Sequence, residues 1–326
     1  MIEARYYQNL GDSVECLLCP HHCRIASGKV GLCRGRKNEK GKLWAINYGR
    51  TVSVAVDPIE KKPLYHFYPG SPILSIAPNG CNMRCPFCQN WQISQRSAPT
   101  EYISPENLLA LVQDYNLIGV SYTYTEPMIW FEYIMDAGKL LKEHGFKNVL
   151  VTNGMVEIEP LRELLKIVDA MNIDLKTMNG VKYRKVLGGD LDAVKRTIEL
   201  AISHCHCEIT HLIVTGFNDS VAEITHLVDY LASLSPKLVL HLSRYFPHYQ
   251  YRREPTPTAT IERAYQIARR KLSFVYLGNI ITEHGNDTIC PSCGNKVITR
   301  SFYHTKVVGV SQGKCSRCGE DLNIVI

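Results

Sequence analysis

Three cysteines that lie close together constrain this chain more than any other feature of its sequence. Cys81, Cys85 and Cys88 stand in the run NGCNMRCPFCQNW, with the spacing CxxxCxxC, directly after an apolar run at residues 73–77. Three thiolates on one short loop can hold three irons of a cubane [4Fe–4S] cluster and leave the fourth iron without a protein ligand. A structural cluster or a zinc site would normally have a fourth ligand. The spacing therefore predicts a cluster whose open iron binds a small molecule and passes it an electron.

The middle of the chain alternates apolar, β-branched runs with amphipathic helical patterns, which favours an α/β fold with a parallel sheet. The predicted strands cover residues 73–77, 118–124, 148–152, 170–174, 208–214 and 238–242, with an edge strand at 274–280. The predicted helices cover residues 105–116, 128–144, 159–168, 190–204 and 220–234. Six βα units fit a partial (β/α)6 barrel, because a complete eight-unit barrel usually needs about 250 residues. In βα barrels the active site lies at the carboxyl ends of the strands.

Composition changes along the chain and predicts three regions. These are a cysteine-rich N-terminal region at 1–70, the partial barrel at 71–282 and a small zinc-ribbon-like domain at 283–326. We expect residues 1–70 to be irregular. The net charge of +6 is mild and its basic residues are scattered, which fits an anionic or zwitterionic ligand and gives no support to nucleic-acid binding. With no long apolar run and no signal-peptide core, the sequence predicts a cytoplasmic protein that does not bind membranes.

Four cysteines near the C-terminus form the paired knuckles CPSCG and CSRCG, which is the layout of a zinc ribbon. The residues between the knuckles, at 297–302 and 305–310, are predicted to form strands. The pattern favours zinc over a single iron. The predicted ligands are Cys290, Cys293, Cys315 and Cys318.

A second set of four cysteines has the spacing C-x2-C-x3-C-x9-C, at Cys16, Cys19, Cys23 and Cys33. Four thiolates can hold either zinc or an auxiliary iron–sulfur cluster, so the sequence leaves the metal open. His21 and His22 are substitute ligands if one of the cysteines is free.

The CxxxCxxC loop resembles that of the radical S-adenosylmethionine (SAM) enzymes. In those enzymes the amino and carboxylate groups of SAM chelate the open iron, and the reduced cluster cleaves SAM to methionine and a 5′-deoxyadenosyl radical. The resemblance implies that Phe87 lies beside the adenine. It also implies that Thr125 and Glu126 bind the SAM amino group, because these enzymes often carry a GGE motif at that strand end. Glu126 would in addition be favourable at the start of the following helix.

Polar residues at the ends of the other predicted strands are further candidates for contact with SAM or substrate: Tyr124, Thr152, Asn153, Asp174, Lys176, His241, Ser243 and Arg244. Asn153 with Gly154 is also a plain turn signal. Asp174 and Lys176 alternate with apolar neighbours, so both are expected to point into the mouth of the barrel. The structural alternative for them is a buried ion pair. Arg244 suits a carboxylate through its bidentate guanidinium.

Longer segments resemble the pyruvate formate-lyase activating branch of these enzymes: TNG at 152–154, DLK at 174–176, YRKVLGG at 183–189 and IVTGFND at 213–219. The chain is still more similar to the radical SAM member of the AmmeMemoRadiSam system, through LCPHHC at 18–23, DPIEKKPLYH at 57–66, TYTEP at 123–127, HLSRYFP at 241–247 and VYLGN at 275–279. The activating enzymes usually place an aspartate before TNG and a basic residue on the fifth strand. Val151 and Thr210 stand at those places here.

The predicted function is therefore that of an enzyme that cleaves SAM reductively at a [4Fe–4S] cluster and uses the radical on an unidentified small-molecule or protein substrate. The alternative is an activase of a glycyl-radical enzyme, which acts on a partner protein. Either reaction needs an external electron donor such as flavodoxin or ferredoxin. An electron carrier or a zinc-binding interaction module, as a third class, would have no use for residues that contact SAM.

Overall fold

The computed structural model describes residues 1–326, which divide into two compact units. The first unit contains Met1–Asp57, Ile73–Met171 and Gly180–Cys205. The second contains Pro58–Pro72, Asn172–Asn179 and His206–Ile326, so the C-terminal cysteine knuckles belong to it. The three regions expected from composition stay a prediction.

Parallel strands form the centre of the first unit. Strand β9 (Pro72–Ala77) pairs with β11 (Gly119–Tyr122), and β11 pairs with β12 (Lys147–Thr152). The strand β8 (Ser53–Pro58) follows β9 in the sheet order. Because parallel neighbours need crossover connections, helices separate β9, β11 and β12 in the sequence.

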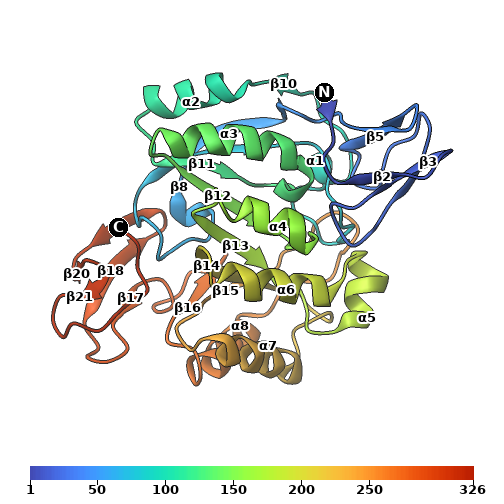
Figure 1. The fold of residues 1–326 in the computed structure, drawn as a ribbon. Helices are drawn as coiled ribbons and strands as arrows, with labels where there is room; N and C mark the ends of the chain where they lie inside the picture. Colours follow the sequence, from blue (N-terminus) through green and yellow to red (C-terminus); the bar gives the residue numbers. More distant parts are fainter. The chain divides into compact units, whose positions relative to one another are not determined.

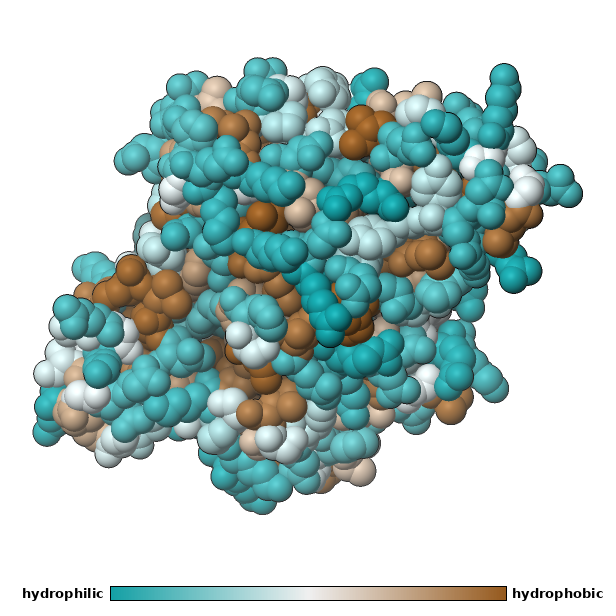
Figure 2. Space-filling view, viewed as in Figure 1, coloured by the Kyte–Doolittle hydropathy of each residue, from teal (hydrophilic) through white to brown (hydrophobic).

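Side-chain capping marks the start of one crossover helix of the first unit. Helix α2 (Pro105–Asp114) starts after Ser104, whose hydroxyl accepts the Asn107 N–H at 3.2 Å. A 3-10 turn, η2 (Pro127–Trp130), leads into α3 (Phe131–Glu143), and α4 (Ile158–Leu164) follows β12. Helices α2 and α3 lie side by side (Figure 1). The surface over them is mainly hydrophilic with small apolar patches (Figure 2), as expected of amphipathic helices.

The N-terminal part of the first unit is not irregular, so that expectation was wrong. It contains short antiparallel strands: β1 (Ile2–Glu3), β2 (Tyr7–Asn9), β3 (Ser13–Cys16), β4 (Arg24–Ala26), β5 (Arg36–Glu39), β6 (Lys42–Ala45) and β7 (Arg50–Thr51), which pairs with β10 (Glu101–Tyr102). Strands this short show no clear alternation in sequence. The β5–β6 hairpin turns through Lys40 and Gly41, which both have positive φ, as a two-residue hairpin turn of this kind requires.

Short helices complete the first unit around the cysteine loop. Helix α1 (Trp91–Ser94) follows the loop directly. The short α5 (Gly180–Lys182) continues into a π-helix, η3 (Tyr183–Leu187), and Asp190 caps α6 (Leu191–Ala201) by accepting the Ala193 N–H.

The second unit has its own parallel strands, β14 (His206–Ile213), β15 (Val239–Arg244) and β16 (Val275–Gly278), in that order. Helices α7 (Val221–Leu234) and α8 (Thr258–Arg269) lie side by side (Figure 1). The sequence did not predict α8. Strand β13 (Ala170–Asp174) belongs to both units, because the boundary falls after Met171.

The C-terminal part of the second unit is a set of short strands. β17 (Thr288–Ile289), β18 (Lys296–Ser301) and β19 (His304–Val307) pair antiparallel, as do β20 (Val310–Ser311) and β21 (Lys314–Cys315). Val297 and Leu322 share one apolar core with Val239 and Phe274. This C-terminal set of short strands therefore packs against the start of β15 and the residue before β16.

The alternation of strands and helices confirms the predicted α/β class. The seven predicted strands of the middle region all exist, with ends shifted by a few residues. None of the helices combines the length and apolarity that crossing a bilayer requires.

Candidate active site

The cysteine triplet lies in an irregular loop between β9 and α1. Cys85 is buried, and Cys81 and Cys88 are partly buried. Backbone and side-chain bonds hold the loop in place: the Arg84 N–H donates to the Leu187 carbonyl at 2.8 Å, and the Gln95 side chain donates to the Met83 carbonyl at 3.0 Å. The structure therefore fixes the loop independently at two points.

Polar groups surround the sulfur atoms of this loop. Cys81 Sγ accepts the Met83 N–H at 3.3 Å and the Asn153 side-chain amide at 3.6 Å. Cys88 Sγ lies 3.2 Å from the Ser94 hydroxyl. Hydrogen bonds to ligand sulfurs are one of the means by which a protein sets the potential of an iron–sulfur cluster.

Burial raises the pKa of the Cys81 thiol well above its ordinary value, and the nearby Glu126 carboxylate and Cys85 thiol raise it further. A thiolate in this place needs a positive partner. Cluster irons would supply that charge, so the donor set fits an iron–sulfur group.

Glu126 is fully buried and joins the ends of two strands. Its carboxylate accepts the Thr152 hydroxyl at 2.6 Å and the Asn153 N–H at 2.8 Å. It also accepts the Met128 N–H at 2.9 Å, as the N-cap of η2. The capping role that the sequence allowed is present, and the predicted contact with a SAM amino group stays a prediction.

The neighbours of Glu126 bind the cysteine loop as well. Thr125 donates its hydroxyl to the Pro78 carbonyl at 2.8 Å, and the carbonyl of Tyr124 accepts the Asn90 side-chain amide at 2.6 Å. Tyr124 has a positive φ of 65° and donates its hydroxyl to Asp57. Phe87 is buried within the loop. Six predicted residues, Phe87, Tyr124, Thr125, Glu126, Thr152 and Asn153, thus belong to the same unit as the triplet.

The remaining strand-end candidates belong to the second unit. Asp174 and Lys176 form an ion pair with 2.8 Å between Nζ and Oδ2, but the pair is partly exposed and not buried as the structural alternative expected. Arg244 donates from Nε to the Thr256 carbonyl at 2.7 Å, and its guanidinium lies over the Phe246 ring. Ser243 lies against Gly278, where an added Cβ would come within 2.7 Å of its hydroxyl. Their predicted contacts with SAM or substrate remain untested.

His241 is nearly buried and is bound to Glu208, with 2.6 Å between Nε2 and Oε2. Glu208 also contacts His206 at 2.9 Å and accepts the backbone N–H groups of Tyr65 and His66. Although burial opposes ionisation, the hydrogen bonds from His206 and His241 hold the pKa of Glu208 well below its usual range. This network attaches the proline-rich 58–72 segment to β14.

The C-terminal cysteines form a compact four-sulfur site. All four ligand atoms lie within 4.8 Å of one another, and the pairs Cys290–Cys318 and Cys293–Cys315 are 3.6 and 3.7 Å apart. Four sulfurs bound tetrahedrally at about 2.3 Å to one zinc lie about 3.8 Å apart. The geometry fits a single metal ion, as the sequence predicted.

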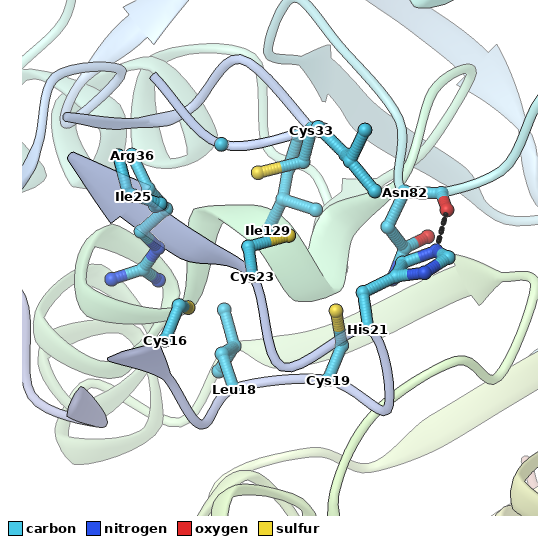
Figure 3. A pocket seen from close by; sticks show the side chains of 12 residues that line it. Cys16, Leu18, Cys19, His21, Cys23, Ile25, Cys33, Arg36, Asn82 and Ile129 are labelled. Atoms are coloured by element: carbon cyan, nitrogen blue, oxygen red, sulfur yellow. Dashed lines mark hydrogen bonds between the residues drawn. The ribbon is translucent and has the colours of Figure 1, made fainter. Parts of the chain in front are cut away.

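The N-terminal cysteines lie together in the first unit and line a cavity with Leu18, His21 and Arg36 (Figure 3). His21 is bonded through Nε2 to the Asn82 carbonyl at 2.6 Å, whereas His22 contacts Glu157 at 3.0 Å. Both histidines are thus engaged outside the sulfur set.

Three functional neighbours were not found from the sequence: Asn82, Ser94 and Glu208. Asn82 follows Cys81 and contacts His21 and Asn153. Its position next to a predicted cluster ligand was the sequence signal that could have identified it. Ser94 lies in α1, where nothing in the sequence indicates a sulfur contact. Glu208 is an acid in an otherwise apolar strand, which was a signal for a buried, paired carboxylate.

The radical SAM superfamily model matches residues 75–231. An uncharacterized protein of Methanocaldococcus jannaschii is 41% identical over the whole of both chains. The pyruvate formate-lyase 1-activating enzyme of Escherichia coli is 29% identical, over 43% of this chain and 60% of its own length. The structure of Streptococcus suis SuiB bound to S-adenosylmethionine is similar in fold, with a TM-score of 0.50 and 16% identity over 65% of this chain and 50% of that one. This chain belongs to the radical SAM superfamily and is an enzyme.

Proposed function

We propose that the enzyme cleaves SAM reductively at a [4Fe–4S] cluster held by Cys81, Cys85 and Cys88, and directs the resulting radical to a substrate. The observation that carries the proposal is the cysteine loop at the end of β9, with hydrogen bonds to Cys81 Sγ and Cys88 Sγ. When bound, the cluster supplies the electron that splits the SAM sulfonium into methionine and a 5′-deoxyadenosyl radical.

The residues around the loop have separate tasks in this proposal. Asn153 donates toward the sulfur of Cys81, and the Ser94 hydroxyl would donate toward Cys88 once that residue is a thiolate; both contacts would set the electron density of the cluster. Glu126 fixes the ends of β11 and β12, and with Thr125 it provides oxygen acceptors for the SAM ammonium. Phe87 and Tyr124 shield the loop and pack against the adenosyl part. Asp174, Lys176, His241, Ser243 and Arg244 contact the rest of SAM or the substrate.

A second candidate function is activation of a glycyl-radical enzyme, in which the substrate is a glycine of a partner protein. The similarity to the E. coli activating enzyme over 43% of this chain favours it. The YRKVLGG segment supports the same candidate, because it forms the π-helix that holds the cysteine loop through Leu187 and Arg84. Both candidates use a one-electron donor such as flavodoxin or ferredoxin.

We also propose zinc as the metal of the C-terminal site. The sulfur separations of 3.6 and 3.7 Å support it, since they match one tetrahedral ion. The site closes a ribbon of very short strands, so its role in this proposal is structural.

Formation of 5′-deoxyadenosine tests the main proposal. The protein is reconstituted with iron and sulfide without oxygen, reduced and given SAM, and the product is measured by mass spectrometry. Wild type should release 5′-deoxyadenosine and Cys85→Ala should not. A glycyl radical signal in electron paramagnetic resonance (EPR), obtained only when a glycyl-radical enzyme is added, would favour the activase over the first candidate.

A further inference from the structure

The cavity lined by the N-terminal cysteines has a volume of about 20 Å3. Cys16 ends β3, Cys19 and Cys23 lie in the turn that follows, and Cys33 lies just before β5. Figure 3 shows the four side chains on different sides of the same space, and most of the other walls are apolar. Four thiols therefore converge on one small, mostly apolar cavity.

The spacing of these thiols differs from that of the C-terminal set. Only the C-terminal cysteines bring three or more ligand atoms within 4.8 Å of one another. Four sulfurs on one zinc touch and leave no void between them. A cubane holds its four thiolates on four different irons, so their sulfurs lie further apart around a larger body. Neither the N-terminal set nor the triplet of Cys81, Cys85 and Cys88 brings three sulfurs within 4.8 Å of one another, which fits thiolates on separate irons.

A buried cation with unused donors lies beside the cavity. Arg36 is 1% exposed and donates from Nη1 to Glu132 at 2.6 Å, but its Nε and Nη2 have no hydrogen-bond partner. Figure 3 shows its guanidinium next to Cys16. Buried N–H groups almost always have an acceptor. Thiolates and inorganic sulfides of a cluster would supply acceptors and a charge opposite to that of the guanidinium.

The cavity also abuts the loop of the catalytic triplet, on both sides of Cys81. The His21 ring bonds to the carbonyl of Asn82 at 2.6 Å (Figure 3). The carbonyl of Cys33 lies so close to Gly80 that an added Cβ would come within 2.2 Å of it. Residues on each side of Cys81 are therefore packed against the segments that carry the N-terminal cysteines.

We infer that the N-terminal cavity holds a second [4Fe–4S] cluster, with Cys16, Cys19, Cys23 and Cys33 as its four ligands and Arg36 as its buried counter-ion. All four irons have protein ligands, so this cluster does not bind SAM. On assembly the four thiols lose their protons and each forms a bond to one iron. Because this second cluster lies beside Cys81, the environment of the catalytic cluster depends on it.

The decisive test removes the catalytic ligands and counts metals. The full-length variant Cys81→Ala/Cys85→Ala/Cys88→Ala, reconstituted without oxygen, should keep about four irons and four sulfides per chain. After reduction it should show an EPR signal of a [4Fe–4S] cluster that SAM does not change. Absence of iron, or zinc bound in excess of the single C-terminal site, would overturn the inference.

Matched variants locate the bound iron. Adding Cys19→Ser to the triple variant should remove the iron and sulfide, whereas adding Cys205→Ser, a thiol outside both four-cysteine sets, should leave them. Iron that persists after Cys19→Ser contradicts the assignment. If the triple variant does not fold, the wild type decides, because it should contain about eight irons rather than about four.

Discussion

The side-chain amide of Asn153 donates to the sulfur of Cys81, with 3.6 Å between Nδ2 and Sγ. The same amide donates to the Asn82 side chain at 2.9 Å, and the Asn153 side-chain oxygen Oδ1 accepts the Met155 N–H at 2.8 Å. One short, buried side chain thus connects the TNG turn after β12 to the cysteine loop after β9. The position of Cys81 depends on this turn.

Replacing Asn153 with alanine should shift the catalytic cluster to a more negative reduction potential, because it removes a donor to a ligand sulfur. We expect SAM cleavage to slow by about 10- to 100-fold, as is typical when a group that supports a metal ligand is lost. The potential is measured by redox titration with EPR, and cleavage by 5′-deoxyadenosine release. Asn79→Ala is the control. Asn79 lies in the same loop, but its side chain bonds to the backbone of Ala98 and not to a ligand sulfur. Equal potentials in Asn153→Ala and wild type would contradict this role.

Replacing Glu126 with glutamine should destabilise the first unit. Its carboxylate accepts three donors, from Met128, Thr152 and Asn153, and an amide group cannot accept them all. A buried donor left without its acceptor costs about 1–3 kcal/mol. Urea unfolding of the reconstituted protein measures the loss, with Glu159→Gln at an exposed helical position as the control. A loss no greater than that of the control would show that the network does not stabilise the fold.

Acid should destabilise the second unit through His66. Burial lowers the pKa of His66 to about 3, from an ordinary value of 6.5. Between these values the unfolded chain binds a proton that the folded protein does not, so stability falls as pH decreases from about 6.5 toward about 3. The slope from one such group approaches about 1.4 kcal/mol per pH unit. Neutral His66 donates from Nδ1 to the Leu322 carbonyl and accepts from the Tyr276 hydroxyl.

The melting temperature as a function of pH tests this effect. His66→Asn removes the titrating group, so its melting temperature should fall less steeply between about pH 6.5 and pH 4, even if the variant is less stable throughout. His226→Asn, at an exposed position of α7, should keep the wild-type slope. The same slope in His66→Asn and wild type would assign the acid sensitivity to other groups, of which Glu208 is the first to test.

Loss of one C-terminal cysteine should remove one zinc per chain. Cys293→Ala deletes a ligand, and the apolar core that Cys290 and Cys315 share with Val239 and Phe274 should then loosen. We expect a lower melting temperature together with the loss of zinc by elemental analysis. Arg317→Ala changes an exposed residue of the other knuckle of the same site and should keep both. Full zinc content in Cys293→Ala would show that the metal is bound elsewhere.

The sequence predicted the elements whose own residues carry a strong pattern. Strand β13 has the predicted bounds, and α2 begins at Pro105 after Ser104, where the N-cap and the proline both signal a helix start. The four C-terminal cysteines converge as their knuckle spacing indicated. In each case the information lies within a few neighbouring residues.

Contacts between distant segments could not be predicted in this way. Glu126 was expected to face a ligand, yet much of its bonding is to Thr152 and Asn153, which depends on how β11 and β12 are paired. His241 was predicted as a candidate for contact with SAM or substrate, and nothing in the sequence indicated that the buried Glu208 of the neighbouring strand binds it. The strands of residues 1–58 were missed because elements of two to six residues are stabilised by pairing with other strands, and their own residues carry little signal.

The production of 5′-deoxyadenosine by the reduced, reconstituted enzyme tests the central claim most directly. The account predicts that wild type releases it from SAM, that Cys81→Ala, Cys85→Ala and Cys88→Ala each abolish release, and that Cys207→Ala does not. Release from the three loop variants at the wild-type rate, or no release from wild type that carries its full iron and sulfide, would contradict the account.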